Sequence, residues 1–286
     1  MEYVTLNNGV KMPILGFGAY QLHDDKESEE SIYNALMAGY RLIDTAASYG
    51  SEPAVGRAIK RSGIPREEIF VTTKLWVQDY GDESSIKAFE RSLERLGLDY
   101  VDLYLMHQPF GDVYGAWRAM ETIYHDGKAR AIGVSNFYPD RLTDLTLHNE
   151  IKPAVDQVEI NPFCQQIENT AFMKEFGVQP EAWSPLATGR GGIFENKTLM
   201  SIAKKYNRSL AQIVLRWVIQ RGIVVISKAG QKAHMLENFQ VFDFELSQED
   251  MDAIMAMNME TSVYFGKMSH RDPETVKSLG TMKFKT

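Results

Sequence analysis

The sequence predicts one α/β domain, residues 1–286, folded as a (β/α)8 TIM barrel that begins with a β-hairpin. Short apolar runs of strand length recur along the chain, and β-branched residues enrich most of them. A segment of helical periodicity separates successive runs, so that a strand and a helix repeat roughly every 30 residues, which is typical of βαβ units. No shift in composition marks a second domain. An open doubly wound sheet remains the alternative.

The strands follow in order after the hairpin. Residues 4–12, VTLNNGVKM, carry an Asn-Asn-Gly turn signal and predict the hairpin. The later runs are apolar almost throughout, as expected of parallel strands that are buried on both faces. The eight barrel strands are predicted at 13–20, 40–46, 68–75, 100–107, 129–136, 154–160, 178–185 and 223–229.

Three helices carry the clearest signals. Residues 85–97 place Ile86, Phe89, Leu93 and Leu96 at spacings of three and four before a glycine, which predicts an amphipathic helix with a glycine stop. Residues 209–222 and 30–39 repeat this pattern, each ending at a glycine. The methionine-rich stretch 251–260 is expected to be an amphipathic helix packed on the barrel.

Composition excludes several classes of function. The net charge of -7 and the pI near 5.5 argue against a nucleic-acid or anionic-membrane surface, which would need a basic patch. No apolar run approaches a membrane span, and the start lacks a secretory signal. The single cysteine, Cys164, suits a reducing cytoplasm, where we expect this protein. The six histidines include no HxH or HExxH pair, so no metal site is expected.

Side chains that can take part in catalysis or ligand binding lie at the ends of the predicted strands. In a TIM barrel the active site lies at the C-terminal ends of the strands. The residues found there are Asp44, Tyr49, Lys74, His107, Ser135, Asn136, Gln157, Trp183, Ser184 and Lys228. Each alone has a structural explanation: a carboxylate can cap a segment, a tyrosine can pack a loop, and a histidine can be satisfied in a core. The first four, from three successive strands, favour a functional site when taken together.

These four residues suggest acid–base chemistry. A tyrosine has an unperturbed pKa of about 10, which a neighbouring ammonium lowers. Asp44 could hold Lys74 charged beside Tyr49, and a neutral His107 could bind an oxygen on which charge develops. A proton donor beside an oxyanion partner, without a nucleophile, suits hydride addition to a carbonyl.

At these residues the sequence resembles the aldo-keto reductase superfamily, of the bacterial 2,5-diketogluconate reductase and aldose reductase type. The motifs DTAASYG, VTTKLW, DLYLMHQP, IGVSNF, DQVEINP, AWSPL and VISKA appear in that family's order. The resemblance implies a barrel that reduces aldehydes or ketones with NAD(P)H and has no Rossmann fold. It implies Tyr49 as general acid, Asp44 and Lys74 as its tuning pair, and His107 as the group that orients the carbonyl.

The resemblance also implies a cofactor site. From the nicotinamide carboxamide to the adenosine end, its residues are Ser135, Asn136, Gln157, Trp183, Ser184, Leu186, Lys228, Glu237 and Asn238, and the glycine-rich stretch 187–194 would cover the cofactor. Many NADPH-dependent relatives have serine at the place of Ala229 and arginine at that of His234. Neither residue here replaces an arginine on a phosphate. We expect NADPH, because Lys228 remains, with weak discrimination against NADH.

The substrate site is expected to be partly aromatic, built from Tyr20 and Trp76, with Gln108 where some relatives carry an aromatic residue. A C-terminal tail would lie over the barrel mouth. Its residues Tyr264 and Phe265 could line the pocket or only pack the barrel. The expected partner is a small-molecule carbonyl compound, with no nucleic acid or membrane. The family is often monomeric, so a monomer is expected, and the natural substrate stays open.

Two other functions remain open at the sequence level. Lys74 could form a Schiff base in a lyase, although a paired, protonated lysine is a poor nucleophile. A barrel could also hold NADP(H) as a redox sensor without catalysis, but a sensor has no need of a proton donor.

Overall fold

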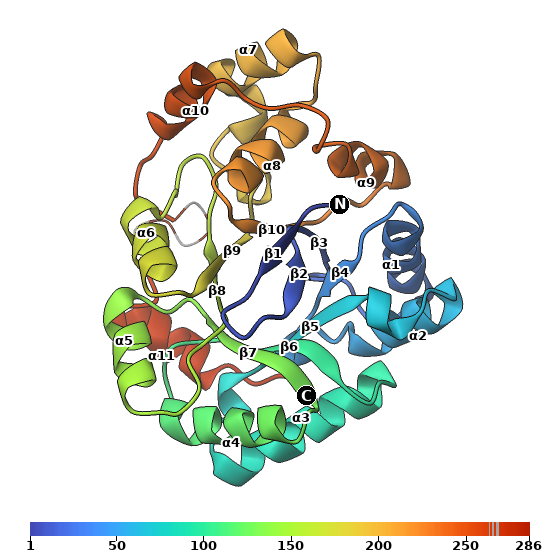
Figure 1. Ribbon diagram of the computed structural model, residues 1–286, viewed down its shortest axis with the longest axis vertical. Helices are drawn as coiled ribbons and strands as arrows, with labels where there is room; N and C mark the ends of the chain where they lie inside the picture. Colours follow the sequence, from blue (N-terminus) through green and yellow to red (C-terminus); the bar gives the residue numbers. More distant parts are fainter. Residues whose placement is uncertain (263, 265, 267–268) are drawn as a thin grey trace.

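The computed structural model describes residues 1–262, 264, 266 and 269–286. Eight parallel strands close into a barrel in the order β10-β3-β4-β5-β6-β7-β8-β9 (Figure 1). Their bounds are β3 Leu15–Gly18, β4 Leu42–Asp44, β5 Phe70–Leu75, β6 Val101–Met106, β7 Ala129–Ser135, β8 Val155–Glu159, β9 Gln179–Trp183 and β10 Val224–Ser227. Every predicted strand is present, and the TIM-barrel prediction is confirmed over the open sheet.

Helices surround the barrel (Figure 1). They are α1 Lys26–Met37, α2 Glu52–Ser62, α3 Asp82–Leu96, α4 Val113–His125, α5 Pro139–Leu147, α6 Ile167–Glu175, α7 Lys197–Tyr206, α8 Leu210–Gln220, α9 Lys232–Phe239, α10 Gln248–Met255 and α11 Pro273–Thr281. Short 3-10 helices are η1 Ala47–Tyr49, η2 Arg66–Glu68, η3 Val77–Asp79, η4 Ala187–Gly189 and η5 Ile193–Glu195.

The predicted helices are present, but their first and last residues differ from the predicted ones. Helix α3 starts three residues before the predicted one and stops before Gly97, whose φ of 63° is the left-handed conformation that glycine adopts easily. A capping box starts α8, in which the side chains of Ser209 and Gln212 each accept a hydrogen bond from the other's backbone N–H. Helix α10 ends at Met255, and Met259 beyond it is 57% exposed. The methionine-rich helix is therefore shorter than predicted.

The N-terminal hairpin, β1 Tyr3–Thr5 with β2 Lys11–Pro13, covers the end of the barrel where the strands begin. The Asn7 side chain donates to the Pro153 carbonyl at 2.9 Å, and that of Asn8 donates to the Arg130 carbonyl at 2.9 Å. Met12 is completely buried. The hairpin therefore plugs this end, which leaves the opposite end, where the strands stop, for a ligand.

The C-terminal segment lies at that opposite end. The Trp76 indole N–H, just after β5, donates to the Met282 carbonyl at 2.9 Å. The Gln78 amide donates to the Phe284 carbonyl and accepts from its N–H, at 3.0 and 2.8 Å. The Phe284 ring meets Trp76 edge to face, with centroids 5.0 Å apart. The tail is thus fixed to the rim of the barrel mouth, as expected.

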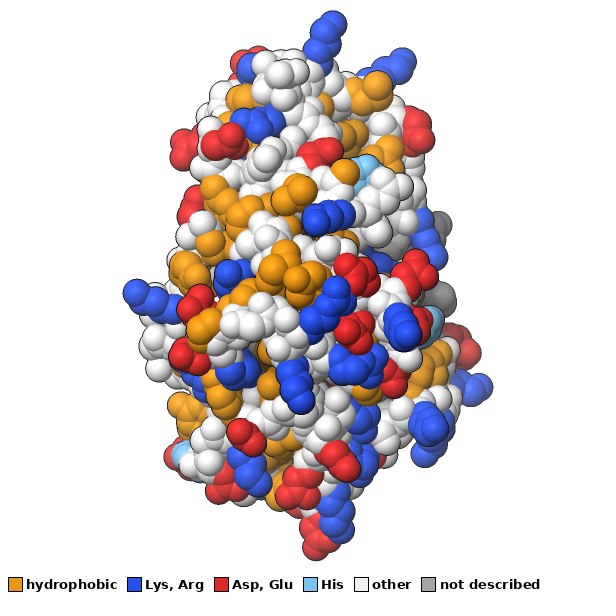
Figure 2. Space-filling view, turned by 90° about the vertical axis from the view of Figure 1, so that its right-hand side faces the viewer, with side chains coloured by type: hydrophobic (Ala, Val, Ile, Leu, Met, Phe, Trp, Pro, Cys, Tyr) orange, Lys and Arg blue, Asp and Glu red, His pale blue; other side chains and the backbone are white. Residues whose placement is uncertain are grey.

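Charges of both signs are mixed on the outer surface. Figure 2 shows basic and acidic side chains interspersed on one face of the molecule. Across α1 and α2, Arg57 pairs with Glu29 at 2.8 Å and Arg61 with Glu30 at 2.6 Å. In the part of the chain that the structure describes, every helix is either too short or too polar for a membrane span.

Candidate active site

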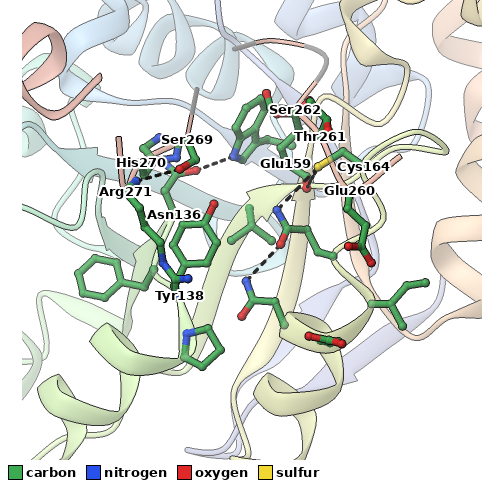
Figure 3. Close-up of a pocket in the computed structure, with 18 of the residues that line it drawn as sticks. Asn136, Tyr138, Glu159, Cys164, Glu260, Thr261, Ser262, Ser269, His270 and Arg271 are labelled. Carbon is green, nitrogen blue, oxygen red and sulfur yellow. Dashed lines mark hydrogen bonds between the residues drawn. The ribbon is translucent and has the colours of Figure 1, made fainter. Parts of the chain in front are cut away.

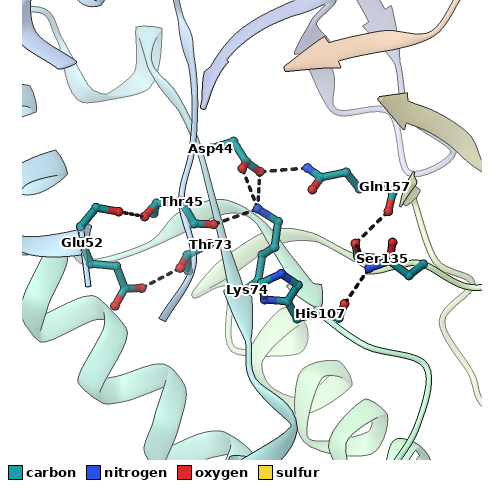
Figure 4. Close-up of polar contacts among 10 residues, drawn as sticks. Asp44, Thr45, Glu52, Thr73, Lys74, His107, Ser135 and Gln157 are labelled. Carbon is teal, nitrogen blue, oxygen red and sulfur yellow. Dashed lines mark hydrogen bonds and ion pairs between the residues drawn. The ribbon is translucent and has the colours of Figure 1, made fainter. Parts of the chain in front are cut away.

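A buried ion pair lies at the ends of β4 and β5. The Lys74 ammonium donates to both Asp44 carboxylate oxygens, at 2.6 and 2.7 Å, and to the Thr45 carbonyl at 3.0 Å (Figure 4). Lys74 is fully buried. Burial is the largest effect and would lower the pKa of Lys74, but Asp44 and Tyr49 act against it, and the pKa is raised. The lysine is therefore held charged inside the barrel.

Tyr49 lies beside this pair, at the end of η1. The Lys74 Nζ is 5.1 Å from the centroid of the Tyr49 ring. Gly50 follows with a φ of 72°, which allows the sharp turn into α2. Tyr49 is half-buried as a whole residue.

The pKa of Tyr49 differs from the prediction. Burial of the phenol is the largest effect and raises the pKa, while Lys74 lowers it and Asp44 raises it again. The result lies above the usual value. The expectation of an unusually acidic phenol is therefore wrong, although Lys74 acts in the predicted direction. A sequence identifies a charged neighbour more readily than the depth of burial.

His107, at the end of β6, faces the same spot. Its ring centroid lies 5.6 Å from that of Tyr49 and 5.0 Å from that of Trp76. Burial, followed by Lys74 and His270, holds the pKa of His107 well below its usual range, so the imidazole is neutral. Its Nδ1 is buried and makes no hydrogen bond. The four predicted catalytic residues therefore gather in one place.

The residues predicted to hold a carboxamide form a linked cluster. The Gln157 amide donates to Asp44 at 2.9 Å, which connects this cluster to the ion pair. The Ser135 hydroxyl donates to the Gln157 carbonyl at 2.8 Å, and the Asn136 amide donates to the Ser135 hydroxyl at 3.1 Å. The Trp183 indole donates to the Asn136 side-chain oxygen at 3.0 Å. Ser135, Asn136, Gln157 and Trp183 lie on or directly after the three neighbouring strands β7, β8 and β9.

The remaining predicted cofactor residues extend away from the ion pair. Ser184 has a φ of 54° and a buried hydroxyl without a hydrogen-bond partner, and Leu186 is half-buried. The exposed Lys228 donates to the Tyr20 carbonyl at 2.7 Å. On or before α9, Ala229 and Asn238 are buried, Glu237 is half-buried and His234 is exposed.

The predicted substrate residues border Tyr49 and His107. The Tyr20 ring lies edge to face with Tyr49, 5.1 Å between centroids, and its hydroxyl is 2.9 Å from that of Tyr264. Trp76 contacts His107 as described above. Gln108 is buried, and its side-chain oxygen makes no hydrogen bond. Tyr264 therefore does reach the mouth, whereas Phe265 lies outside the described residues.

Two features of the site escaped the sequence analysis. Glu181 is a fully buried carboxyl on β9, and the sequence does not single it out because it lies within an apolar run of strand length. A cavity of about 600 Å³ also lies next to Asn136 and Trp183, lined in addition by Tyr138, Glu159 and residues near the tail (Figure 3). Within the described ranges, no cluster of His, Cys, Asp or Glu side chains could hold a metal ion.

The chain matches a known protein family over most of its length. The Aldo/keto reductase family profile matches residues 14–259. This chain belongs to the aldo/keto reductase family. The family consists of oxidoreductases that act on small carbonyl compounds and use nicotinamide cofactors, so the resemblance read from the motifs is confirmed.

Relatives cover almost the whole of this aldo/keto reductase. It is 50% identical to a glyoxal reductase of Bacillus subtilis over 263 residues, 92% of this chain and 95% of the relative. It is 47% identical to a 9,11-endoperoxide prostaglandin H2 reductase of Trypanosoma cruzi, over 91% and 93% of the two chains. A Bombyx mori aldo-keto reductase solved in complex with NADP has 34% identity and a TM-score of 0.87, with 96% of each chain covered.

Proposed function

We propose that this aldo/keto reductase reduces aldehydes or ketones to alcohols with NADPH, and that Tyr49 delivers the proton to the carbonyl oxygen. One observation carries the proposal: a fully buried, charged Lys74 and a neutral His107 flank the same phenol. A bound reduced nicotinamide supplies the hydride that adds to the carbonyl carbon.

The raised pKa of Tyr49 suits a proton donor. At neutral pH the phenol keeps its proton until negative charge develops on the substrate oxygen. As the proton leaves, the phenolate gains the attraction of the Lys74 ammonium, which Asp44 holds in place. His107 donates a hydrogen bond to the same oxygen, because a neutral imidazole carries one N–H. Solvent then returns a proton to Tyr49.

The cofactor fits the side chains around this spot. Ser135, Asn136 and Gln157 offer donors and acceptors that suit a carboxamide, and the half-buried Trp183 offers a ring face to a nicotinamide. The buried, unpartnered hydroxyl of Ser184 is a ready donor for a phosphate. The NADP complex of the Bombyx mori relative supports the choice of NADPH.

We assign only a weak preference for NADPH over NADH. The exposed Lys228 is available for a 2′-phosphate, but Ala229 offers no hydrogen bond and His234 no forked guanidinium. Small dicarbonyl aldehydes are the first substrates to test, since a relative with 50% identity is named a glyoxal reductase.

A carbonyl panel assayed with both cofactors tests the proposal. Loss of the reduced-nicotinamide absorbance should depend on a small aldehyde and should continue over many turnovers. A bound cofactor without turnover on any aldehyde or ketone would favour a redox sensor. Covalent trapping of substrate on Lys74 by borohydride would favour a lyase, which the full set of hydrogen bonds on its ammonium disfavours.

A further inference from the structure

Glu181 shares the barrel interior with the residues of the proposed site. In the pairing of β8 with β9 it stands opposite Gln157, and in the pairing of β9 with β10 it stands opposite Val224. Paired residues on neighbouring strands point to the same face of a sheet. Glu181 therefore lies on the inner face with Gln157, whose amide donates to Asp44.

Among the described residues, no cation forms an ion pair with Glu181. Both of its carboxyl oxygens are buried, and neither makes a hydrogen bond. The Gln157 amide, which lowers the pKa of Glu181, donates its hydrogen bond to Asp44. The protons of Lys74 are directed at Asp44 and Thr45. A buried carboxylate left without partners is costly, so the group retains its proton.

Two charged residues affect the pKa of Glu181. Asp44 from β4 and Lys74 from β5 are the charged groups that act on it, while β8 presents the neutral Gln157 and β10 the apolar Val224. Burial, followed by Asp44, raises the pKa of Glu181 to about 8, and Gln157 and Lys74 only partly oppose them. Its titration therefore falls close to neutral pH.

We propose that Glu181 is a positioning residue that acts through Lys74. When Glu181 is uncharged, Asp44 is the main anion near the Lys74 ammonium. When Glu181 is ionised, Tyr49 becomes a weaker proton donor. A second anion would hold the lysine more tightly and oppose formation of the phenolate. This inference rests on the proposed function, because it concerns the proton that Tyr49 gives away.

The test compares wild type with Glu181→Gln, an isosteric change that imitates the uncharged form. In wild type, kcat for carbonyl reduction should fall threefold to tenfold, in order of magnitude, as the pH rises through about 8. In Glu181→Gln this step should be absent, and KM for NADPH should match that of wild type. An identical pH profile in both proteins would overturn the inference while the proposed function stands.

Asp156→Asn is the matched control. Asp156 is also a fully buried carboxyl of raised pKa, but it precedes Gln157 on β8 and so points to the other face. It should keep the wild-type profile, and loss of the step there would overturn the assignment to Glu181. Wild type without turnover on any carbonyl would refute the proposed function and the inference with it.

Infrared spectroscopy gives a readout that does not depend on turnover. The difference spectrum of wild type minus Glu181→Gln should show the carbonyl stretch of a protonated carboxyl at about pH 6 and lose it as the pH passes about 8, because the band of the buried Asp156 is common to both proteins. A difference spectrum without this band at about pH 6 would overturn the inference.

Discussion

Replacing Lys74 with methionine would separate the structural and chemical roles of the buried ion pair. The change leaves Asp44 buried without its cation, from which it is now 2.6 Å away. Removing one partner of a buried pair costs about 3–5 kcal/mol. The Gln157 amide still donates to Asp44, so we expect the lower end, about 3 kcal/mol. At roughly 2–4 °C per kcal/mol, the melting temperature should fall by about 6–12 °C.

The double variant Asp44→Asn with Lys74→Met completes the experiment. It removes both charges, so stability should return to within about 1–2 kcal/mol of wild type. Carbonyl reduction should stay at least about 100-fold down, because no cation remains to receive the phenolate. Thermal unfolding followed by circular dichroism, and turnover measured on the same samples, give the two readouts. A stable Lys74→Met protein, or an active double variant, would refute the reasoning.

Three further predictions follow from the site. Tyr49→Phe should lower kcat about 10² to 10⁴-fold and leave the Kd for NADPH, measured by fluorescence titration, nearly unchanged; normal turnover would mean that another residue is the acid. The double variant Ala229→Ser with His234→Arg should raise the ratio of kcat/KM for NADPH to kcat/KM for NADH at least about tenfold, because a guanidinium binds phosphate in a forked geometry. An unchanged ratio would show that these positions do not contact the cofactor. Glu181 has a pKa raised above its unfolded value, so the folded state holds an extra proton between about pH 4.5 and 8, and the free energy of unfolding should fall with rising pH there. Glu181 should contribute at most about 1.4 kcal/mol per pH unit to this fall in urea titrations, so the slope should be shallower by that contribution in Glu181→Gln.

The strands and the gathering of Asp44, Tyr49, Lys74 and His107 could be predicted from the sequence, because apolar runs report burial and strand ends in a barrel converge. The sign of the pKa shift on Tyr49 could not, since it depends on how much water the folded chain excludes. Glu181 was missed for a related reason. A lone charge within an apolar run is a signal, but its depth and lack of partners appear only once neighbouring strands are aligned.

The end of helix α3 could be predicted from the sequence, whereas the contacts of the C-terminal tail could not. Gly97 correctly predicted the end of α3, because a left-handed residue is a local requirement. The attachment of the tail to Trp76 and Gln78 joins residues about two hundred positions apart, through backbone carbonyl and amide groups that carry no sequence signature. Such contacts depend on the three-dimensional path of the chain.

The two ends of the polypeptide have unequal tolerance for added sequence. The hairpin places the first residues beneath the barrel, far from Tyr49, whereas Phe284 and Thr286 bond to Gln78 at the entrance. An affinity tag appended after Thr286 would obstruct the barrel mouth and disturb the contacts of Trp76. The same tag before Met1 would lie at the opposite end of the barrel, away from the site.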